Sequence, residues 1–483
     1  MNKGKCLFMR LVLIIGLIVQ CALLQASTLI DGLYYDLDTS NRTATVTYEV
    51  DGTGNYSSLS ANVKIPENVV YNGVIFTVTK IADKAFANCT VIESISIPGT
   101  VLQIGQNTSV SDLPFYKCTA LKSIRFEDGV QNLVLGSYYT DSGYSSSEGI
   151  GLFSYCPLEE VYIGRNITYI DGSYPFENYQ KKYGYSAFYN QPKLAKVTIS
   201  STVTEIPAYL FRSCSVLSNV SILGQLSKIP AYSFDGCKIT ELTLSNSIEN
   251  IGDYAFQNNT ALTTAVLGNN VKTIGKYAFS GCSNLASLNL GKSLVSIGDY
   301  SFQSVGSKSG VGLILSVPST LSSIGKFAFY KSAVSSINIP NSVTTIGESC
   351  FAENTKLENV TIGNGCSELP NSIFSGCSVL SSVFLSDGLA TISDAVFANC
   401  KSLESISIPG TVLQIGQNTG VSDLPFYNCT SLKSVRFEDG VQNLVLGSYY
   451  TDSGYSSSEG IGLFSYCPLE EVYIGRNITY IEW

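Results

Sequence analysis

Two neighbouring stretches, LTTAVLGNNVKTIGKYAFSGC from Leu262 to Cys282 and LASLNLGKSLVSIGDYSFQSV from Leu285 to Val305, carry one pattern at an offset of 23 residues. The spacing of two between the apolar residues Ala265 and Leu267 is typical of a strand, whereas the spacing of three from Val271 to Ile274 favours a tighter turn. The pattern therefore predicts that each unit forms one coil of a repeat protein.

The motif Phe-x-x-Cys marks these units along the chain. We expect its two side chains to form a buried structural ladder, with the same residues pointing inward in every coil. The ladder residues are Phe86, Cys89, Phe115, Cys118, Phe153, Cys156, Phe211, Cys214, Phe234, Cys237, Phe279, Cys282, Phe374, Cys377, Phe397, Cys400, Phe426, Cys429, Phe464 and Cys467. Five further units keep the phenylalanine and replace the cysteine, at Phe188, Phe256, Phe302, Phe329 and Phe351.

A coil of this size cannot bury its own apolar face, so neighbouring coils must stack with their strands in parallel register. The predicted fold is a repeat solenoid of about 15 coils, mainly β with short turns and 3-10 segments. We expect the solenoid to occupy residues 78–483. Residues 28–77 lack the motif and read as an N-terminal β cap, in which Asn72-Gly73 is a hairpin turn signal.

The stretches SSINIPNSVTTIGESC, from Ser335 to Cys350, and VKTIGKYAFSGC, from Val271 to Cys282, resemble the BspA-like leucine-rich repeats. The resemblance extends from about residue 78 to 481, and its Ile-Pro, Ile-Gly, Ala-Phe and Cys positions recur together in register. It implies an exported surface protein that binds or adheres to proteins of a host or a neighbouring cell. It implies no catalytic residues.

Residues 1–27 read as a signal peptide, because Lys3, Lys5 and Arg10 precede an apolar core from Leu11 to Ile18. We therefore expect the protein to be secreted or attached to the cell surface, and lipid anchoring at Cys21 stays open beside release. No later run is long enough to be a transmembrane segment.

The net charge and the composition exclude several classes of function. The net charge of −9 makes nucleic acid a poor partner. The absence of histidine removes Ser-His-Asp and Cys-His pairs and the commonest metal ligand. We expect a protein that is not an enzyme, with no catalytic residues, no metal and no cofactor.

We expect the ten ladder cysteines to be small core residues with free, buried thiols. Stacked coils repeat at about 4.8 Å, which exceeds the roughly 3.8 Å between Cβ atoms that a disulfide requires. Cys350 and Cys366 lie outside the motif, and their state stays open.

Residues 89–170 and 400–481 are near-copies that differ at 7 of 82 positions, which indicates a duplication. The second copy stops at Glu482-Trp483, where the first continues. We expect an open edge there, covered by a partner, by self-association with a second copy of the chain or by a missing domain.

Enlarged units are the predicted ligand-binding site, because residues beyond the coil length must leave the stack. Tyrosine among Ser and Gly is typical of adaptable binding loops, although these rings could also fold back over an adjacent coil. The residues are Tyr138, Tyr139, Tyr144, Tyr174, Tyr179, Tyr183, Tyr185, Tyr449, Tyr450 and Tyr455.

The predicted function is binding or adhesion through the extended face of the solenoid to extracellular or surface proteins. Two alternatives stay open: a surface module that binds glycans through aromatic rings, and a structural spacer that has no ligand.

Overall fold

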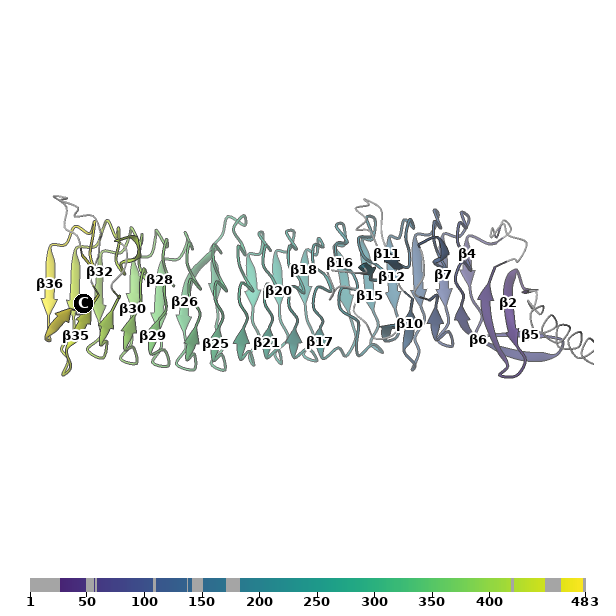
Figure 1. Cartoon of the computed structure of the whole chain (residues 1–483), viewed down its shortest axis with the longest axis horizontal. Helices are drawn as coiled ribbons and strands as arrows, with labels where there is room; N and C mark the ends of the chain where they lie inside the picture. Colours follow the sequence, from purple (N-terminus) through teal and green to yellow (C-terminus); the bar gives the residue numbers. More distant parts are fainter. Residues whose placement is uncertain are drawn as a thin grey trace, which may run out of the picture. The chain divides into compact units, whose positions relative to one another are not determined.

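The computed structural model describes residues 27–48, 56, 59–106, 110–136, 138–140, 151–170, 183–417, 421–447 and 462–480, which form mainly short strands joined by turns (Figure 1). Backbone contacts divide the chain into two units. The first consists of Met1–Leu158 and Ile167–Ala187, and the second of Glu159–Asn166 and Phe188–Trp483. Each unit is described by itself below.

The first unit opens with a meander in which β1, β2 and β3 pair antiparallel, followed by a hairpin of β5 and β6. Asn72 and Gly73 connect the hairpin with φ angles of 52° and 78°. Positive φ at both central residues is what a two-residue turn between twisted strands requires, so the hairpin expected there is present. The strands are β1 Thr28–Ile30, β2 Leu33–Asp38, β3 Thr43–Thr47, β5 Asn68–Tyr71 and β6 Val74–Ile81.

Strand β6 crosses the cap boundary that we placed after residue 77, and it continues the sheet into the coils. It pairs in parallel with β8, which pairs with β10, which pairs with β13. A second parallel row contains β4, β7 and β9. The bounds are β4 Asn62–Lys64, β7 Ser94–Ile97, β8 Gln103–Ile104, β9 Ser123–Phe126, β10 Leu133–Leu135 and β13 Ile167–Tyr169, with a 3-10 turn η1 at Val110–Asp112.

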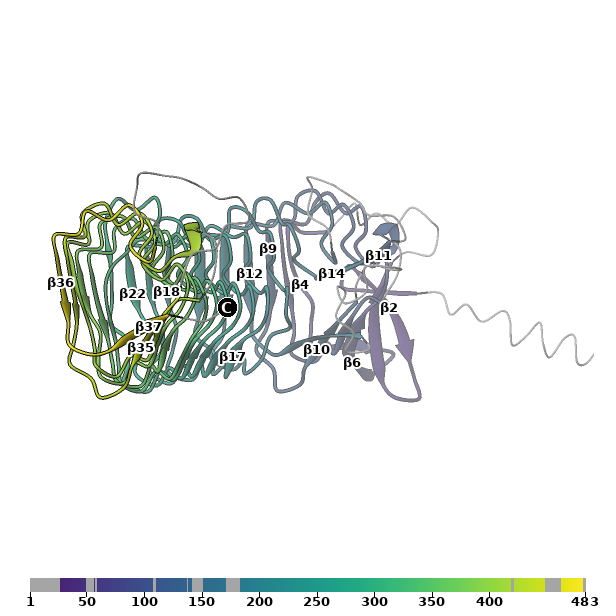
Figure 2. The ribbon, with the colours of Figure 1, turned by 60° about the vertical axis from the view of Figure 1, so that its left-hand side comes forward.

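The second unit stacks its coils through two rows of parallel strands, which lie along separate sides of the stack (Figure 2). The first row contains β12 Glu160–Ile163, β15 Lys196–Ile199, β16 Asn219–Ile222, β18 Glu241–Thr243, β20 Thr264–Val266, β22 Ser287–Asn289, β24 Leu313–Leu315, β26 Val334–Ile339, β28 Asn359–Ile362, β30 Ser382–Phe384, β32 Ser405–Ile408, β34 Ser434–Phe437 and β36 Glu471–Ile474.

The strands of the second row are mostly two residues long. They are β17 Lys228–Ile229, β19 Asn250–Ile251, β21 Thr273–Ile274, β23 Ser296–Ile297, β25 Ser323–Ile324, β27 Thr345–Ile346, β29 Glu368–Leu369, β31 Thr391–Ile392, β33 Gln414–Ile415, β35 Leu444–Leu446 and β37 Ile478–Tyr480, with a 3-10 turn η3 at Val421–Asp423. The repeat solenoid expected from the sequence is thus the observed fold.

The second row corrects one expectation. The spacing of three from Val271 to Ile274 favoured a turn, yet Thr273 and Ile274 form strand β21. This strand pairs with β19 on one side and β23 on the other. Stacking supplies partners to both edges of a segment that is too short to be recognised as a strand by its own periodicity.

The core of each unit is a column of stacked phenylalanine rings. Phe86, Phe115 and Phe153 stack in the first unit, with centroids 5.4 and 5.1 Å apart. In the second unit the column begins with Phe188 and Phe211 at 5.3 Å and ends with Phe426 and Phe464 at 5.1 Å. Every ladder phenylalanine except Phe464 is buried.

The ladder cysteines do more than fill space, which the sequence reading did not foresee. The Cys282 thiol donates a hydrogen bond to the carbonyl oxygen of Phe256 at 3.3 Å, and Cys377 donates in the same way to Phe351 at 3.2 Å. Every ladder thiol except that of Cys89 donates to the carbonyl oxygen of the ladder phenylalanine one coil earlier. The motif therefore couples neighbouring coils by a polar contact as well as by ring stacking.

The twelve cysteines of the described residues are free thiols, and all but Cys467 are buried. Cys350 and Cys366, which the sequence left open, belong to this group. Burial raises the pKa of Cys282 to about 12. A thiol that stays protonated at neutral pH is a poor nucleophile, so this column is structural.

Candidate functional site

Four of the ten predicted loop tyrosines lie on a pair of strands in the first unit. Strand β11 (Tyr138–Thr140) pairs antiparallel with β14 (Tyr183–Tyr185), which places the backbone of Tyr138 opposite that of Tyr185 and brings two insertions together. A ligand contact by these tyrosines stays a prediction. The other six, Tyr144, Tyr174, Tyr179, Tyr449, Tyr450 and Tyr455, lie outside the described residues.

A second group of aromatic residues, which the sequence reading missed, forms a column at the surface of the second unit. These half-buried rings stack with centroids 4.4 to 4.9 Å apart and planes within 11° of parallel. We call this column the aromatic stripe. It consists of Tyr209, Tyr232, Tyr254, Tyr277, Tyr300 and Phe327.

Each stripe residue lies two positions before a ladder phenylalanine, in the turn that leads into it, and has a φ angle between 54° and 62°. Hydrogen bonding to the next coil holds this left-handed turn, since the Tyr277 amide donates to the carbonyl of Asp299 at 3.0 Å. Bulky residues rarely adopt such a conformation. The recurring Tyr-x-Phe motif was the signal in the sequence that could have revealed the stripe.

The turn itself does not require an aromatic residue. Ser349, Ser372 and Ala395 occupy the same position in the next three coils, with φ angles of 53°, 58° and 53°. The backbone conformation of the turn therefore does not explain why six consecutive coils carry an aromatic ring at this surface position.

The stacking determines what the stripe can offer to a ligand. Ring faces are covered by the neighbouring rings, so the edges and the tyrosine hydroxyls meet solvent. Burial, with the hydroxyls of Tyr254 and Tyr209 close by, raises the pKa of Tyr232 well above its usual range. The Tyr232 hydroxyl therefore stays protonated at neutral pH, and the stripe presents a line of hydroxyl groups on an apolar column.

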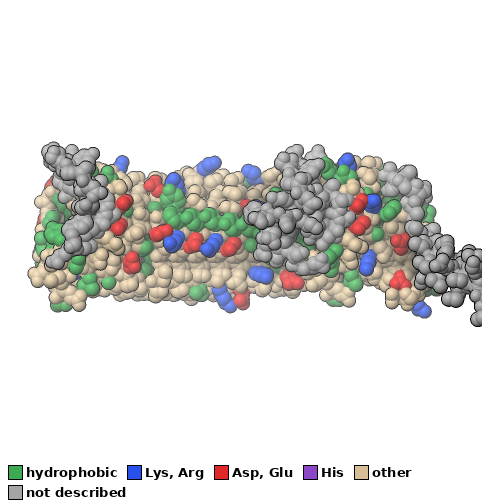
Figure 3. Space-filling model, viewed as in Figure 1, with side chains coloured by type: hydrophobic (Ala, Val, Ile, Leu, Met, Phe, Trp, Pro, Cys, Tyr) green, Lys and Arg blue, Asp and Glu red, His purple; other side chains and the backbone are tan. Residues whose placement is uncertain are grey.

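Charged residues of alternating sign directly precede the last four stripe residues and the same position of the next coil: Asp253, Lys276, Asp299, Lys326 and Glu348. Lys276 Nζ lies 3.4 Å from Asp299 Oδ2, and Lys326 Nζ lies 3.3 Å from Glu348 Oε1. Figure 3 shows a hydrophobic band with acidic and basic side chains alternating beside it. Exposed ion pairs of this kind add little to the stability of the fold. We therefore regard them as part of the surface that a ligand would meet.

One cation lies over the stripe itself. The guanidinium of Arg212 lies 4.8 Å from the centroid of the Tyr232 ring, and its Nε lies 3.0 Å from Asp235 Oδ2. Arg212 thus combines a cation–π contact with an ion pair at one end of the column.

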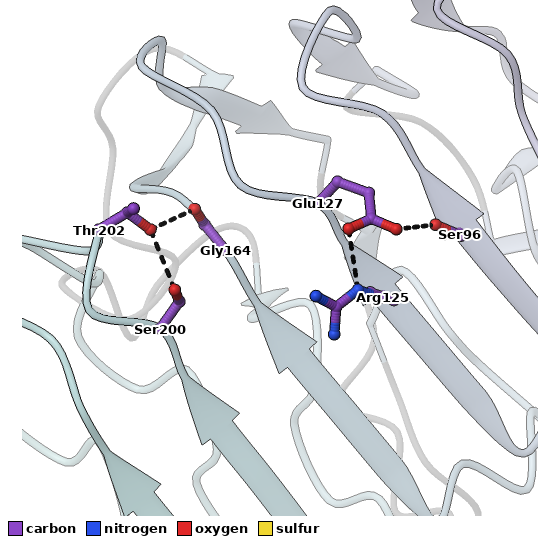
Figure 4. A network of polar contacts seen from close by, with 6 residues as sticks. All are labelled: Ser96, Arg125, Glu127, Gly164, Ser200 and Thr202. Carbon is purple, nitrogen blue, oxygen red and sulfur yellow. Dashed lines mark hydrogen bonds and ion pairs between the residues drawn. The ribbon is translucent and has the colours of Figure 1, made fainter.

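Polar side chains elsewhere hydrogen bond to one another and to backbone carbonyls (Figure 4). In the first unit, Ser96 Oγ donates to Glu127 at 2.5 Å and Arg125 Nε donates to the same carboxylate at 2.9 Å. Burial raises the pKa of Glu127, but these two hydrogen bonds outweigh it and lower the pKa overall. In the second unit, Thr202 Oγ1 donates to the carbonyl of Gly164 at 2.7 Å.

In the part of the chain that the structure describes, no three His, Cys, Asp or Glu side chains are grouped as a metal site would need. Over the same residues, no helix has the length and apolar character needed to cross a membrane.

The stacked parallel coils, the buried ladder and the turn pattern define a solenoid of the leucine-rich repeat class. The family model described as BspA type leucine rich repeat region matches residues 62–182, 181–308 and 314–420. This protein belongs to that family, as its sequence resemblance predicted. No curated protein matches the chain.

Several solved structures are similar to the chain. A leucine-rich repeat protein from Bacteroides ovatus is 24% identical, with 87% of this chain and 90% of that chain covered and a TM-score of 0.49. A leucine rich cell surface protein from Faecalibacterium prausnitzii is 23% identical, with 85% and 94% covered and a TM-score of 0.34. The pneumococcal vaccine antigen PcpA is 16% identical, with 81% and 94% covered and a TM-score of 0.31.

Proposed function

We propose that this protein is an exported, non-enzymatic binding protein and that its aromatic stripe contacts a protein partner. The observation that carries the proposal is the run of six stacked, half-buried rings in turns whose backbone does not require them. Tyrosine edges and hydroxyls on an apolar base are typical of protein interfaces, where tyrosine and arginine are enriched at the residues that contribute most to affinity.

The geometry of the stripe favours a protein over a glycan at this surface. A sugar that stacks on an aromatic ring needs an open ring face, and the faces of Tyr254 and Tyr277 are covered on both sides by their neighbours. The alternating charges from Asp253 to Glu348 offer a partner both signs, which suits a mixed protein surface.

Export, surface location and the domain limits belong to the same proposal. The segment 1–27 has the composition of a signal peptide but lies largely outside the described residues. Self-association through the last described coil also stays a prediction. Its strand β36 exposes Val472 and Ile474 by 45% and 57%, and light scattering over a concentration series would test whether copies associate.

Purified extracellular-matrix proteins, immobilised one by one, provide the test of the stripe. The wild type is compared with the double variant Tyr254→Ser, Tyr277→Ser. Tyr71→Ser serves as a matched control, since Tyr71 is an exposed tyrosine outside the stripe. We expect retention of at least one matrix protein by the wild type and the control, and a loss of at least about tenfold in the double variant.

Circular dichroism and thermal unfolding establish that the double variant is folded before its binding is measured. Equal retention of a matrix protein by the folded double variant and the wild type excludes the stripe as the contact surface. If no matrix protein is retained by the wild type, the spacer alternative is favoured over the binding function.

A further inference from the structure

A long trough crosses the second unit beside the first row of strands. Its volume is about 1440 Å³, and its lining extends from Ser319 to Val441 over the ends of β26, β28, β30, β32 and β34. At about 4.8 Å between stacked coils, it is on the order of 20 Å long. The size exceeds that of pockets for drug-sized molecules, so an extended ligand is the natural occupant.

An exposed phenylalanine lies in this trough. Phe384, at the end of β30, is 61% exposed and pairs in register with Thr361, which pairs with Asn338. The first row of strands is interrupted beside this residue, because β30 is the last strand of one sheet and β32 is the first strand of the next. Among the described residues, no aromatic ring stacks on Phe384, and its high exposure leaves the ring accessible, whereas the ring faces of the stripe are covered.

The polar lining includes hydroxyls that have no hydrogen-bond partner in the described part of the chain. Ser386 is only 6% exposed, and its Oγ is in this state, as is the buried Oγ of Ser342. A buried hydroxyl without a partner is costly unless a ligand or an ordered water supplies one. The amides of Asn341 and Asn364 add donors and acceptors along the same wall.

The wall of the trough is held in place by an arginine. Arg476 donates to the carbonyl oxygens of Pro409, Gly410 and Val412 at 3.0, 2.7 and 2.6 Å. These bonds fix the turn that lines the trough, and a fixed wall lowers the entropy lost when a ligand binds.

The ionisable lining residues are all acidic: Asp387, Glu438 and Asp439. Two of them already have partners. Glu438 accepts hydrogen bonds from Ser407 and from Arg436, the latter at 2.9 Å, and Asp439 accepts one from Tyr473 at 2.9 Å. The acids therefore disfavour an anionic ligand. Arg436 balances the charge of Glu438, and the carboxylates of Asp387 and Asp439 can accept hydrogen bonds from the hydroxyls of a neutral ligand.

We propose that this trough binds a neutral oligosaccharide and that Phe384 stacks against one sugar ring. The aliphatic face of a pyranose carries C–H groups that pack on the negative face of an aromatic ring. Its hydroxyls match the amides, hydroxyls and carboxylates of the wall. This site is separate from the aromatic stripe and binds a different class of ligand.

An array of neutral gluco-, galacto-, manno- and N-acetylhexosamine oligosaccharides, with sulfated and sialylated counterparts and a lysine-rich peptide, tests the proposal. We expect the wild type to retain at least one neutral series more strongly than its anionic counterparts. Phe384→Ala should weaken that binding by at least about tenfold, and Phe384→Trp should keep it. Ile314→Ala is the matched control, because Ile314 on β24 is 75% exposed and does not line the trough.

The outcomes separate this site from the stripe. Unchanged glycan binding by the double variant Tyr254→Ser, Tyr277→Ser supports two independent sites. The proposal is overturned if no neutral oligosaccharide is retained at millimolar concentration, if Phe384→Ala binds as the wild type does, or if the lysine-rich peptide alone is retained.

Discussion

The side-chain amide of Asn259 donates a hydrogen bond of 2.8 Å to the carbonyl oxygen of Phe234 one coil earlier. It is the bond that a cysteine thiol makes in most other coils, and Asn354 repeats it to Phe329 at 2.7 Å. Asparagine therefore replaces cysteine at this position because both donate to the same carbonyl.

This equivalence predicts an order of stabilities. Asn259→Ala should lower the free energy of unfolding by about 3 kcal/mol, because it removes the shorter of two hydrogen bonds to the buried carbonyl of Phe234, takes away the acceptor of the Ile239 amide and opens a cavity. Asn259→Cys should cost about 1 kcal/mol, because the thiol restores that bond. Urea unfolding measures both, with Asn359→Ala on the exposed face of β28 as the control. Equal losses for the alanine and cysteine variants would show that the donor is irrelevant.

The ladder explains why the sequence predicts the fold so well. Residues equivalent to Phe279 and Cys282 point inward in successive coils, so the same pattern of buried residues recurs along the chain. The second strand row was missed because β21 is formed by stacking partners rather than by its own pattern.

The candidate sites were harder to predict. The stripe left a periodic Tyr-x-Phe signal, yet its burial and stacking depend on the left-handed turn before each ladder phenylalanine. The trough left almost no signal, because the equivalent outward residues of the neighbouring coils are polar: Asn338, Thr361 and Ser407. Only the assembled coils show that Phe384 is exposed in the trough.

The free thiols predict a graded reactivity. Cys467 is half-buried, and a hydrogen bond with Cys429 lowers its pKa, whereas burial raises the pKa of Cys214 to about 12. In the native protein at pH 8, iodoacetamide should therefore modify Cys467 well before Cys214, as followed by peptide mass spectrometry. The same reaction on unfolded, unreduced protein should modify both. Linked peptides between ladder cysteines would contradict the free-thiol assignment.

Stability should also fall with rising pH. The Cys282 thiol has a pKa raised from an ordinary value of 9.0 to about 12 by burial, so its protonated form favours the folded state. That contribution is complete below pH 9 and is lost as the pH rises toward 12. At most, one such thiol steepens the decline by about 1.4 kcal/mol per pH unit.

The variant Cys282→Ala removes the pH-dependent contribution of this thiol to the free energy of unfolding. The variant should be less stable at pH 7, because of the cavity, but its free energy of unfolding should decline less between pH 9 and pH 11 than that of the wild type. Cys467→Ala is the control, since the pKa of Cys467 is lowered rather than raised. Parallel declines for wild type and Cys282→Ala would refute the assignment.

Close stacking of the turns predicts that replacing some glycines is costly, and Gly268 is one of them. A Cβ on Gly268 would collide with the carbonyl oxygen of Ser245 one coil earlier. Gly268→Ala should cost about 3 kcal/mol or more through forced separation of the coils. Gly310 has a φ of +76° and open space around a Cβ, so Gly310→Ala should cost only about 1 to 2 kcal/mol of backbone strain. Thermal unfolding ranks the two, and a Gly268→Ala loss no larger than that of Gly310→Ala would show that the coils separate easily.

The insertion tyrosines are the last surface to test, because two roles compete for them. The pairing of β11 with β14 ties two insertions together through their backbones, so replacing side chains there leaves the hydrogen bonds of the strands in place. The variant with Tyr138, Tyr139, Tyr449 and Tyr450 all changed to Ser should unfold within a few degrees of the wild type if the rings serve a ligand, and should lose stability clearly if they cover a coil. Retention of a matrix protein that the wild type binds is measured on the same preparation, beside the stripe variant. Reduced retention by a variant of normal stability assigns the insertions to the binding surface, whereas full retention removes them from it.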